Sequence, residues 1–221
     1  MVQRLIAFFG ADGTGKTTHA DLLVAYFQSH NVKVRKVWIR SPHTLAYIVS
    51  VFFEKINFCR LVTNPFGKKK KYPAVHLNRL LRFFWSLLEF LSVIPVILIR
   101  IYIPLLFGYT VVAERYVADT IVTIAYYIND LGFLKSLTAR ILLCFIPENT
   151  LLIHLDSDYS TLLMRRSSRV EAQDFIEFQR KGYNQIGDML KVTLIDTSNI
   201  NIEQTFSRIL DKLELNKVGQ R

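Results

Sequence analysis

The sequence predicts an α/β protein of three layers (α/β/α), in which helices cover both faces of a five-stranded parallel sheet. Two observations predict this class: short apolar runs rich in β-branched residues recur along the chain, and segments of helical periodicity lie between them. A third is a glycine-rich turn directly after the first apolar run. The 221 residues are 51% hydrophobic and contain no internal repeat or Pro/Gly/Ser-rich linker, so we expect one domain over residues 1–221.

The predicted strands begin with a continuous apolar run, Leu5–Phe9, as expected for a strand that is buried on both faces. The later ones are Val32–Ile39, Thr110–Tyr116, Thr150–Asp156 and Val192–Ser198. Apolar residues recur at helical spacing after the first strand, at Ala20, Leu23, Val24 and Phe27. They line one face of the last predicted helix, at Ile202, Phe206, Ile209, Leu210 and Leu213.

Residues 10–17, GADGTGKT, fit the phosphate-loop pattern G-x-x-x-x-G-K-[ST] without a gap. A predicted strand precedes the pattern and a predicted helix follows it, which argues against a plain surface turn. In such a loop the backbone N–H groups turn inward around phosphate oxygens, and the helix N-terminus adds partial positive charge. We therefore expect a nucleoside triphosphate site, with Lys16 at the β- and γ-phosphates and Thr17 on Mg²⁺. The residues expected to bind ATP are Gly10, Ala11, Asp12, Gly13, Thr14, Gly15, Lys16, Thr17 and Thr18.

The chain is strongly basic, with a formal net charge of +10, which favours an anionic partner such as a phosphorylated small molecule, nucleic acid or a membrane surface. No basic stripe with interleaved aromatic residues is present, so we do not expect nucleic acid. Cys59 and Cys144 have neither metal-site spacing nor the density of a disulfide scaffold. With no secretory signal at the start of this sequence, these features fit a cytoplasmic protein.

Two further groups of polar residues follow predicted strands, where parallel sheets bind ligands. Glu114, Arg115 and Tyr116 close the third strand, and Arg165, Arg166 and Arg169 follow the fourth. The arginines suit a lid that closes over a transferring phosphoryl group, although a basic helix face in water gives the same pattern.

Four segments in this order, GADGTGKTTHA, ERY, RRSSRVEAQDFIEFQRKGY and IDTS, resemble the thymidylate kinase family of nucleoside monophosphate kinases. The resemblance covers the first forty residues and most of the chain after Thr110. It implies a P-loop NTPase fold with strand order 2-3-1-4-5 and a short lid at about residues 163–175. It also implies transfer of the ATP γ-phosphoryl group to dTMP, giving dTDP, with Mg²⁺ as cofactor.

The resemblance also assigns roles to individual residues. The expected catalytic residues are Lys16, Glu114, Arg115, Arg165 and Arg169; the loop offers no arginine of its own, so the lid supplies the catalytic one. Thr17 and Glu114 are the expected Mg²⁺ ligands. The expected acceptor-binding residues are Asp12 at the sugar, Arg115 at the phosphate, and Arg40, Arg79 and Tyr116. Arg40 and Pro42 match the family's motif after the second strand, and Arg82 competes with Arg79. Phe175, Arg180 and Tyr183 match the pattern that follows the lid arginines.

The match breaks at the positions that read the acceptor base. Val75 stands where the family has a stacking phenylalanine, Asp119 where it has a serine, and Ile124 where it has a glutamine. Glu114 replaces an aspartate. Loss of groups that hydrogen-bond a base costs orders of magnitude in discrimination, so a different nucleotide or a membrane-associated acceptor is the alternative to dTMP. A nucleotide-dependent switch without a small-molecule acceptor is a third hypothesis.

Residues 83–107 are apolar enough to span a bilayer by length. A crossing there would place the phosphate loop and Arg115 on opposite sides of the membrane, so we expect two helices joined near Pro95 and packed on the sheet. We expect their excess apolar surface to form a homodimer interface, as related kinases dimerise through this region. Gly67–Pro73, with its lysine run, is predicted to be a solvated loop, and peripheral membrane contact is the less favoured alternative.

Overall fold

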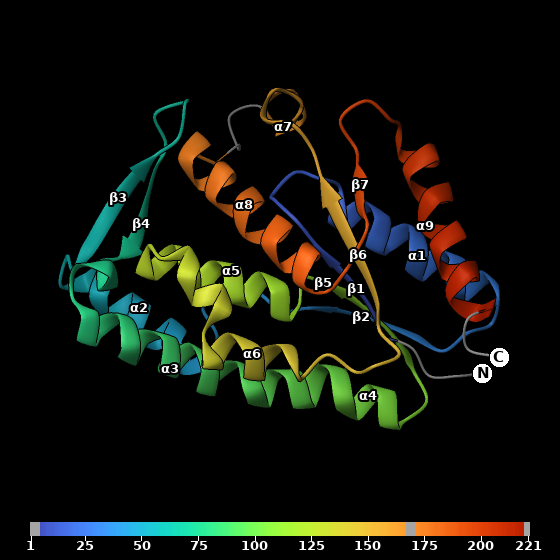
Figure 1. Cartoon of the computed structure of the whole chain (residues 1–221), viewed down its shortest axis with the longest axis horizontal. Coiled ribbons are helices and arrows are strands. Elements are labelled where there is room, and N and C mark those ends of the chain that lie inside the picture. The colour runs from blue at the N-terminus through green and yellow to red at the C-terminus, as the bar shows by residue number, and fades with distance from the viewer. Residues whose placement is uncertain (1–4, 167–170, 219–221) are drawn as a thin grey trace.

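The computed structural model describes residues 5–166 and 171–218, with side chains to residue 213, and its centre is a five-stranded parallel sheet (Figure 1). The strands are β1 (Leu5–Phe9), β2 (Val34–Trp38), β5 (Thr110–Glu114), β6 (Leu151–Asp156) and β7 (Leu194–Asp196). Their order across the sheet is β2-β5-β1-β6-β7, and every neighbouring pair is parallel. Counted along the chain, these five strands have the expected order 2-3-1-4-5.

The sheet separates two hydrophobic clusters because alternate residues of β1 point to opposite faces. Ile6 and Phe8 pack with α1 (Lys16–Ser29) and α9 (Ile202–Val218). Leu5, Ala7 and Phe9 pack in the larger cluster with the helices of the other face. Those helices are α3 (Arg79–Ile97), α5 (Val117–Ile128), α6 (Leu137–Leu143) and α8 (Gln173–Met189). The predicted three-layer α/β/α class is confirmed (Figure 1).

The remaining elements connect these layers. They are the helices α2 (Thr44–Lys55) and α7 (Tyr159–Arg166) and the 3₁₀ turns η1 (Val75–Leu77) and η3 (Leu131–Lys135). The predicted lid at about residues 163–175 takes in the end of α7 and the start of α8, and its residues 167–170 lie outside the described part.

The prediction of a solvated loop at Gly67–Pro73 is wrong, because β3 (Cys59–Thr63) and β4 (Lys69–Pro73) form an antiparallel hairpin. The exposed lysines occupy its water-facing positions, as charged residues often do on unprotected strands. Tyr72, at the end of the lysine run, is 4% exposed and packs against Tyr126 of α5, 5.2 Å between ring centroids. Burial of Tyr72 favours a strand here, and the lysine run beside it gives no signal of that strand in the sequence.

The prediction of two helices joined near Pro95 is also wrong. A single helical stretch runs from Arg79 to Leu106, through α3, a π-helical turn η2 (Leu98–Tyr102) and α4 (Ile103–Leu106). Proline removes one backbone hydrogen bond from a helix interior, and packed helices absorb the resulting distortion in local kinks or wider turns. Here the wider turn begins three residues after Pro95.

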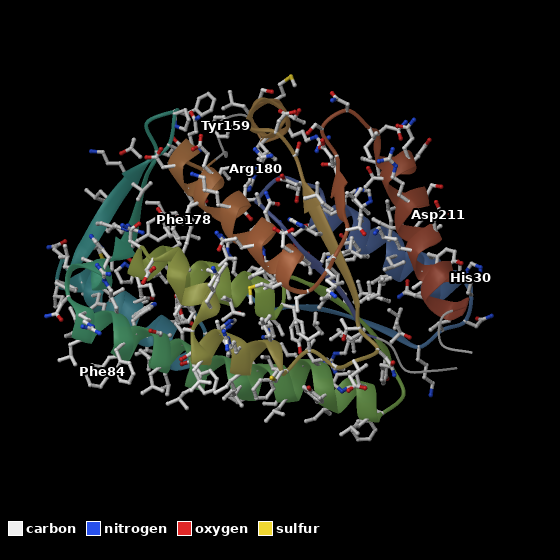
Figure 2. All side chains as sticks on the ribbon, in the orientation of Figure 1. His30, Phe84, Tyr159, Phe178, Arg180 and Asp211 are labelled. Atoms are coloured by element: carbon white, nitrogen blue, oxygen red, sulfur yellow. The ribbon has the colours of Figure 1, made fainter. Side chains whose placement is uncertain are left out.

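This helix is long and apolar enough to cross a membrane by length and composition alone, and only 33% of its most apolar window is buried. One such helix is weak evidence for a membrane span, because core helices pass the same test. Its inner residues, including Trp85, Val93 and Ile97, belong to the core. Phe84, labelled in Figure 2, lies at the outer edge of the molecule.

We call the exposed apolar side chains of α2, α3 and η2 the outer apolar surface. They are Leu45, Tyr47, Ile48, Phe52, Leu80, Phe83, Phe84, Leu87, Leu91, Leu98 and Ile99. The tip of the β3–β4 hairpin lies on the opposite side of the molecule from α3 and α4 (Figure 1). Nearer its base, the hairpin approaches this surface at α2, where Nζ of Lys71 lies 3.8 Å from Oε1 of Glu54.

Candidate functional site: a phosphate loop facing a cationic cluster

The phosphate loop lies between β1 and α1, and two of its glycines are required by close neighbours. Gly10 has a φ of 140°, and a Cβ there would lie 1.9 Å from the carbonyl oxygen of Leu155 in β6. Gly13 has a φ of 100°, and a Cβ there would lie 2.8 Å from Cδ of Arg166. The loop is therefore held tightly against the sheet edge on one side and against α7 on the other.

Lys16 begins α1 and folds back over the loop. Its Nζ donates hydrogen bonds to the carbonyl oxygens of Gly10, at 2.7 Å, and Ala11, at 2.6 Å. Burial and then the nearby charge of Arg115 lower the pKa of Lys16 to about 8, while Asp12 opposes that change. The ammonium group is thus largely desolvated, and an anion at the loop would find a cation that water screens poorly.

Thr17 and Glu114 bring two oxygen ligands together from α1 and β5. The Thr17 hydroxyl donates a hydrogen bond to Oε1 of Glu114. Hydroxyl and carboxylate oxygens are hard ligands that suit Mg²⁺, which usually keeps several waters and takes few protein ligands. The described residues contain no group of three or more His, Cys, Asp or Glu arranged to hold a metal.

Lys36 of β2 is a cation at this site that the sequence analysis missed. Its Nζ lies 3.2 Å from Oε2 of Glu114 and 2.6 Å from Oδ1 of Asp21. Hydrogen bonds and charges from both carboxylates outweigh its slight burial and raise its pKa. Only the parallel pairing of β2 with β5 brings Lys36 to Glu114, so local sequence carries no signal for it.

Arg115 is held by two carboxylates. Its guanidinium donates to Oδ1 of Asp12 and, at 2.7 Å, to Oδ1 of Asp119. The Tyr183 hydroxyl also donates to Oδ1 of Asp119, at 2.9 Å. Burial alone would raise the pKa of Asp12, but Arg115 and Lys16 hold it well below its usual range, so Asp12 is ionised.

The lid arginines that the structure describes point to different places. Arg165 donates to the carbonyl oxygen of Thr197, at 2.5 Å, and to its hydroxyl, at 3.1 Å. Arg166 instead packs against Gly13, and its NH1 lies 3.6 Å from Oδ2 of Asp12. Arg169 lies outside the described residues. Both described lid arginines line the cleft: Arg166 lies against the phosphate loop, and Arg165 is held on Thr197.

The two other residues matched after the lid arginines serve packing. Arg180, labelled in Figure 2, forms a bidentate pair with Asp156 at the end of β6, with nitrogen–oxygen distances of 2.8 to 3.0 Å. Phe175 is buried, and its ring centroid lies 4.5 Å from that of Tyr126. Both contacts fix α8 to its neighbours.

The expected acceptor residues divide into two sets. Arg40 is at the site, with NH2 at 3.5 Å from Oδ2 of Asp12. Arg79 is exposed at the first turn of α3 and forms no hydrogen bond or ion pair with the described residues. Tyr116 is 2% exposed, and its hydroxyl donates to the carbonyl oxygen of Phe145, so it serves the core.

A cleft of about 840 Å³ joins the phosphate loop to the cationic cluster, a size typical of small-molecule sites. Arg40, Arg115 and Arg166 line it, and Trp38 lies at its edge with 48% of its surface exposed. The cleft is also lined by a segment to which the sequence analysis gave no role at the site, with lining residues Thr197, Ile200, Asn201, Ile202, Glu203 and Thr205.

The positions expected to read the acceptor base do not line this cleft. Val75 and Asp119 are each 1% exposed, and Ile124 is fully buried. Asp119 has instead become a partner of Arg115 and Tyr183. These three side chains are therefore packed inside the protein and do not face the cleft.

No model of a known protein family matches the chain. Among solved structures, thymidylate kinase from Ehrlichia chaffeensis is similar over 96% of this chain and 99% of its own, with a TM-score of 0.58 and 19% identity. Thymidylate kinase from Candida albicans is similar over 97% and 92%, respectively, with a TM-score of 0.59 and 18% identity. The chain thus has the fold of the thymidylate kinases.

Proposed function

We propose that this protein is an ATP-dependent nucleoside monophosphate kinase that transfers the γ-phosphoryl group of ATP to dTMP, giving ADP and dTDP. The observation that carries the proposal is one cleft lined both by a phosphate loop and by a cluster of arginines, Arg40, Arg115, Arg165 and Arg166. A reaction between two polyanions requires cations from both sides, and this cleft supplies them.

Each group has a role that follows from its position. Lys16 exchanges its loop carbonyls for the β- and γ-phosphate oxygens of ATP. Thr17 and Glu114 would hold Mg²⁺, which would neutralise charge on the donor phosphates. Arg115 and Arg40 hold the acceptor phosphate, so that its oxygen attacks the γ-phosphorus as the bond to the β-phosphate oxygen breaks. Arg166 faces the same space and stabilises the charge of the transferring group.

Replacement of Lys16 by Ala tests the donor site. We expect turnover to fall to background, because the buried cation at the phosphates is lost. The assay follows ADP release with and without dTMP at saturating ATP. Lys33, an exposed lysine just before β2, supplies the control K33A, which should keep wild-type turnover. Normal turnover in K16A contradicts the mechanism.

A second candidate is transfer to other nucleoside monophosphates. The packed positions Asp119 and Ile124 favour it, because neither offers the amide or hydroxyl that would select thymine. The Candida albicans enzyme, with the same fold, is described as having broad substrate specificity. Parallel assays with dTMP, dUMP and the purine monophosphates separate the two: dTMP alone supports the first, and similar kcat/KM for several supports the second.

We also propose that the enzyme is a cytoplasmic homodimer whose interface is the outer apolar surface. The surface gathers eleven exposed aromatic and aliphatic side chains on α2, α3 and η2, and large exposed apolar surfaces mark interaction sites. Cys59 and Cys144 are both free, in keeping with a reducing compartment.

A further inference from the structure

Glu89 stands out as the single acidic side chain between Arg79 and Leu106. It lies at the middle of α3, and none of its surface is exposed. A carboxyl group in such a place is expensive to ionise unless it has hydrogen-bond partners, and no described cation forms an ion pair with it. The mechanism above gives it no role.

The partners of Glu89 all come from the turn that follows β2. The Ser41 hydroxyl donates to Oε1 at 2.5 Å, and the backbone N–H of His43 donates to Oε2 at 3.4 Å. His43 in turn lies against α5, with its Nε2 at 3.3 Å from the Thr120 hydroxyl oxygen. The carboxyl group therefore bridges the turn to α3, and the imidazole bridges it to α5.

This turn carries Arg40, the residue directly before Ser41. Arg40 reaches into the cleft, with NH2 at 3.5 Å from Oδ2 of Asp12. We propose that Glu89 is a positioning residue for the acceptor: it fixes the Ser41–His43 turn and so places the Arg40 guanidinium at the phosphate of the acceptor. This inference rests on the proposed kinase function and adds a determinant that does not itself touch the substrate.

Ionisation of Glu89 is poised near neutral pH. Burial raises its pKa to about 7, against the hydrogen bonds from Ser41 and His43. The titratable groups that face it are His43 of the turn and Tyr127 of α5. Burial lowers the pKa of His43 to about 4 and raises that of Tyr127, so both are neutral where Glu89 titrates. A neutral carboxyl group accepts hydrogen bonds more weakly than a carboxylate, so protonation of Glu89 loosens the turn. The KM for the nucleotide that accepts the phosphoryl group should therefore rise as the pH falls below about 7.

Steady-state kinetics across this pH range test the inference with the variant E89Q. We expect a roughly tenfold higher acceptor KM at pH 8, the size of one lost hydrogen bond to a charged group, and an unchanged ATP KM. In E89Q, the rise in acceptor KM at lower pH should be only the part that comes from protonation of the acceptor phosphate itself. S92A is the matched control: from the same helix, the Ser92 hydroxyl accepts a hydrogen bond from the backbone N–H of Ala46 in α2, at 3.2 Å, and not from residues 41–43. Equal pH profiles for wild type and E89Q would overturn the proposal.

A double-mutant cycle with R40A tests whether Glu89 acts through Arg40. If it does, E89Q should have little further effect on the acceptor KM in the R40A background. Full additivity of the two effects would overturn the proposed route.

Amide hydrogen exchange gives a readout that needs no substrate. Protection at His43 should be lower in E89Q than in wild type, while protection in β1 and β5 stays the same. If no nucleoside monophosphate is turned over but His43 loses protection in E89Q, the proposed function fails and the role of Glu89 in holding the turn stands. If turnover is normal and His43 protection is unchanged in E89Q, the role of Glu89 fails and the proposed function stands.

Discussion

At the scale of single residues, the site holds charged side chains that are buried away from water and paired with one another. Arg115 illustrates this: it has a φ of 70°, a backbone region that non-glycine residues rarely adopt, and its side chain contacts two carboxylates. Local strain of this kind persists only where surrounding contacts hold it, and it is concentrated at functional sites. Asp119 and Asp12 supply those contacts and pre-orient the guanidinium for an incoming phosphate.

The two described lid arginines should have separable kinetic effects. R166A should lower kcat by about 100-fold, since Arg166 faces the loop where charge develops during transfer. R165A should mainly raise the ATP KM, because Arg165 holds Thr197 on the donor side of the cleft. Initial-rate measurements with each substrate varied in turn distinguish these outcomes. A lower kcat in R165A with no change in R166A would reverse the assignment.

At the scale of elements, the sequence predicts strands better than it predicts their surroundings. β1 has the predicted bounds, since a run buried on both faces leaves a continuous apolar signal. The hairpin at β3–β4 and the continuous helix through Pro95 were missed, because a single buried tyrosine and a π-helical turn decide them. The site could be predicted where a local sequence motif specifies it, as at Lys16 and Thr17. Strand pairing places Lys36, the helical phase of α7 places Arg166, and contacts with a distant turn place Glu89. None of these three causes leaves a pattern in the local sequence.

Burial of Glu89 in α3 also predicts how the stability of the protein depends on pH. Its folded pKa of about 7 exceeds its ordinary value of 4.5, so the folded state holds the proton more tightly than the unfolded state. Protonated Glu89 therefore contributes to the free energy of unfolding, and the contribution is complete below about pH 4.5. It is lost as the pH rises to about 7, which lowers the free energy of unfolding by roughly 3 kcal/mol. E89Q should lack that loss. Urea unfolding at several pH values measures it, and parallel stability curves for the two proteins would contradict the burial argument.

At the scale of the whole molecule, the fold leaves one cleft charged and one helical surface apolar. Two aromatic side chains on the outer apolar surface, Phe83 and Phe84, are each more than half exposed. The hairpin approaches this surface at α2, where Lys71 lies 3.8 Å from Glu54, while its tip lies away from α3 (Figure 1). We propose a second copy of the chain as the partner of the outer apolar surface, with a membrane as the alternative that the next experiment tests.

Sedimentation analysis checks that assembly. We expect a dimer for the wild-type protein without detergent, and a shift toward monomer for F84E, since a carboxylate at the centre of an apolar interface is costly to desolvate. K70E, on the hairpin, should leave the dimer unchanged. A wild-type monomer that binds detergent micelles or lipid vesicles would instead assign this surface to a membrane.

The central claim is that two anionic substrates meet across one cleft, between the phosphate loop and the cluster around Arg115. Calorimetric titration with adenosine and thymidine joined through a polyphosphate tests it most directly, since this molecule occupies both halves at once. The account predicts tighter binding than for ATP or dTMP alone, and marked weakening in both K16A and R115A. Affinity no better than that of ATP, or insensitivity to R115A, would contradict it.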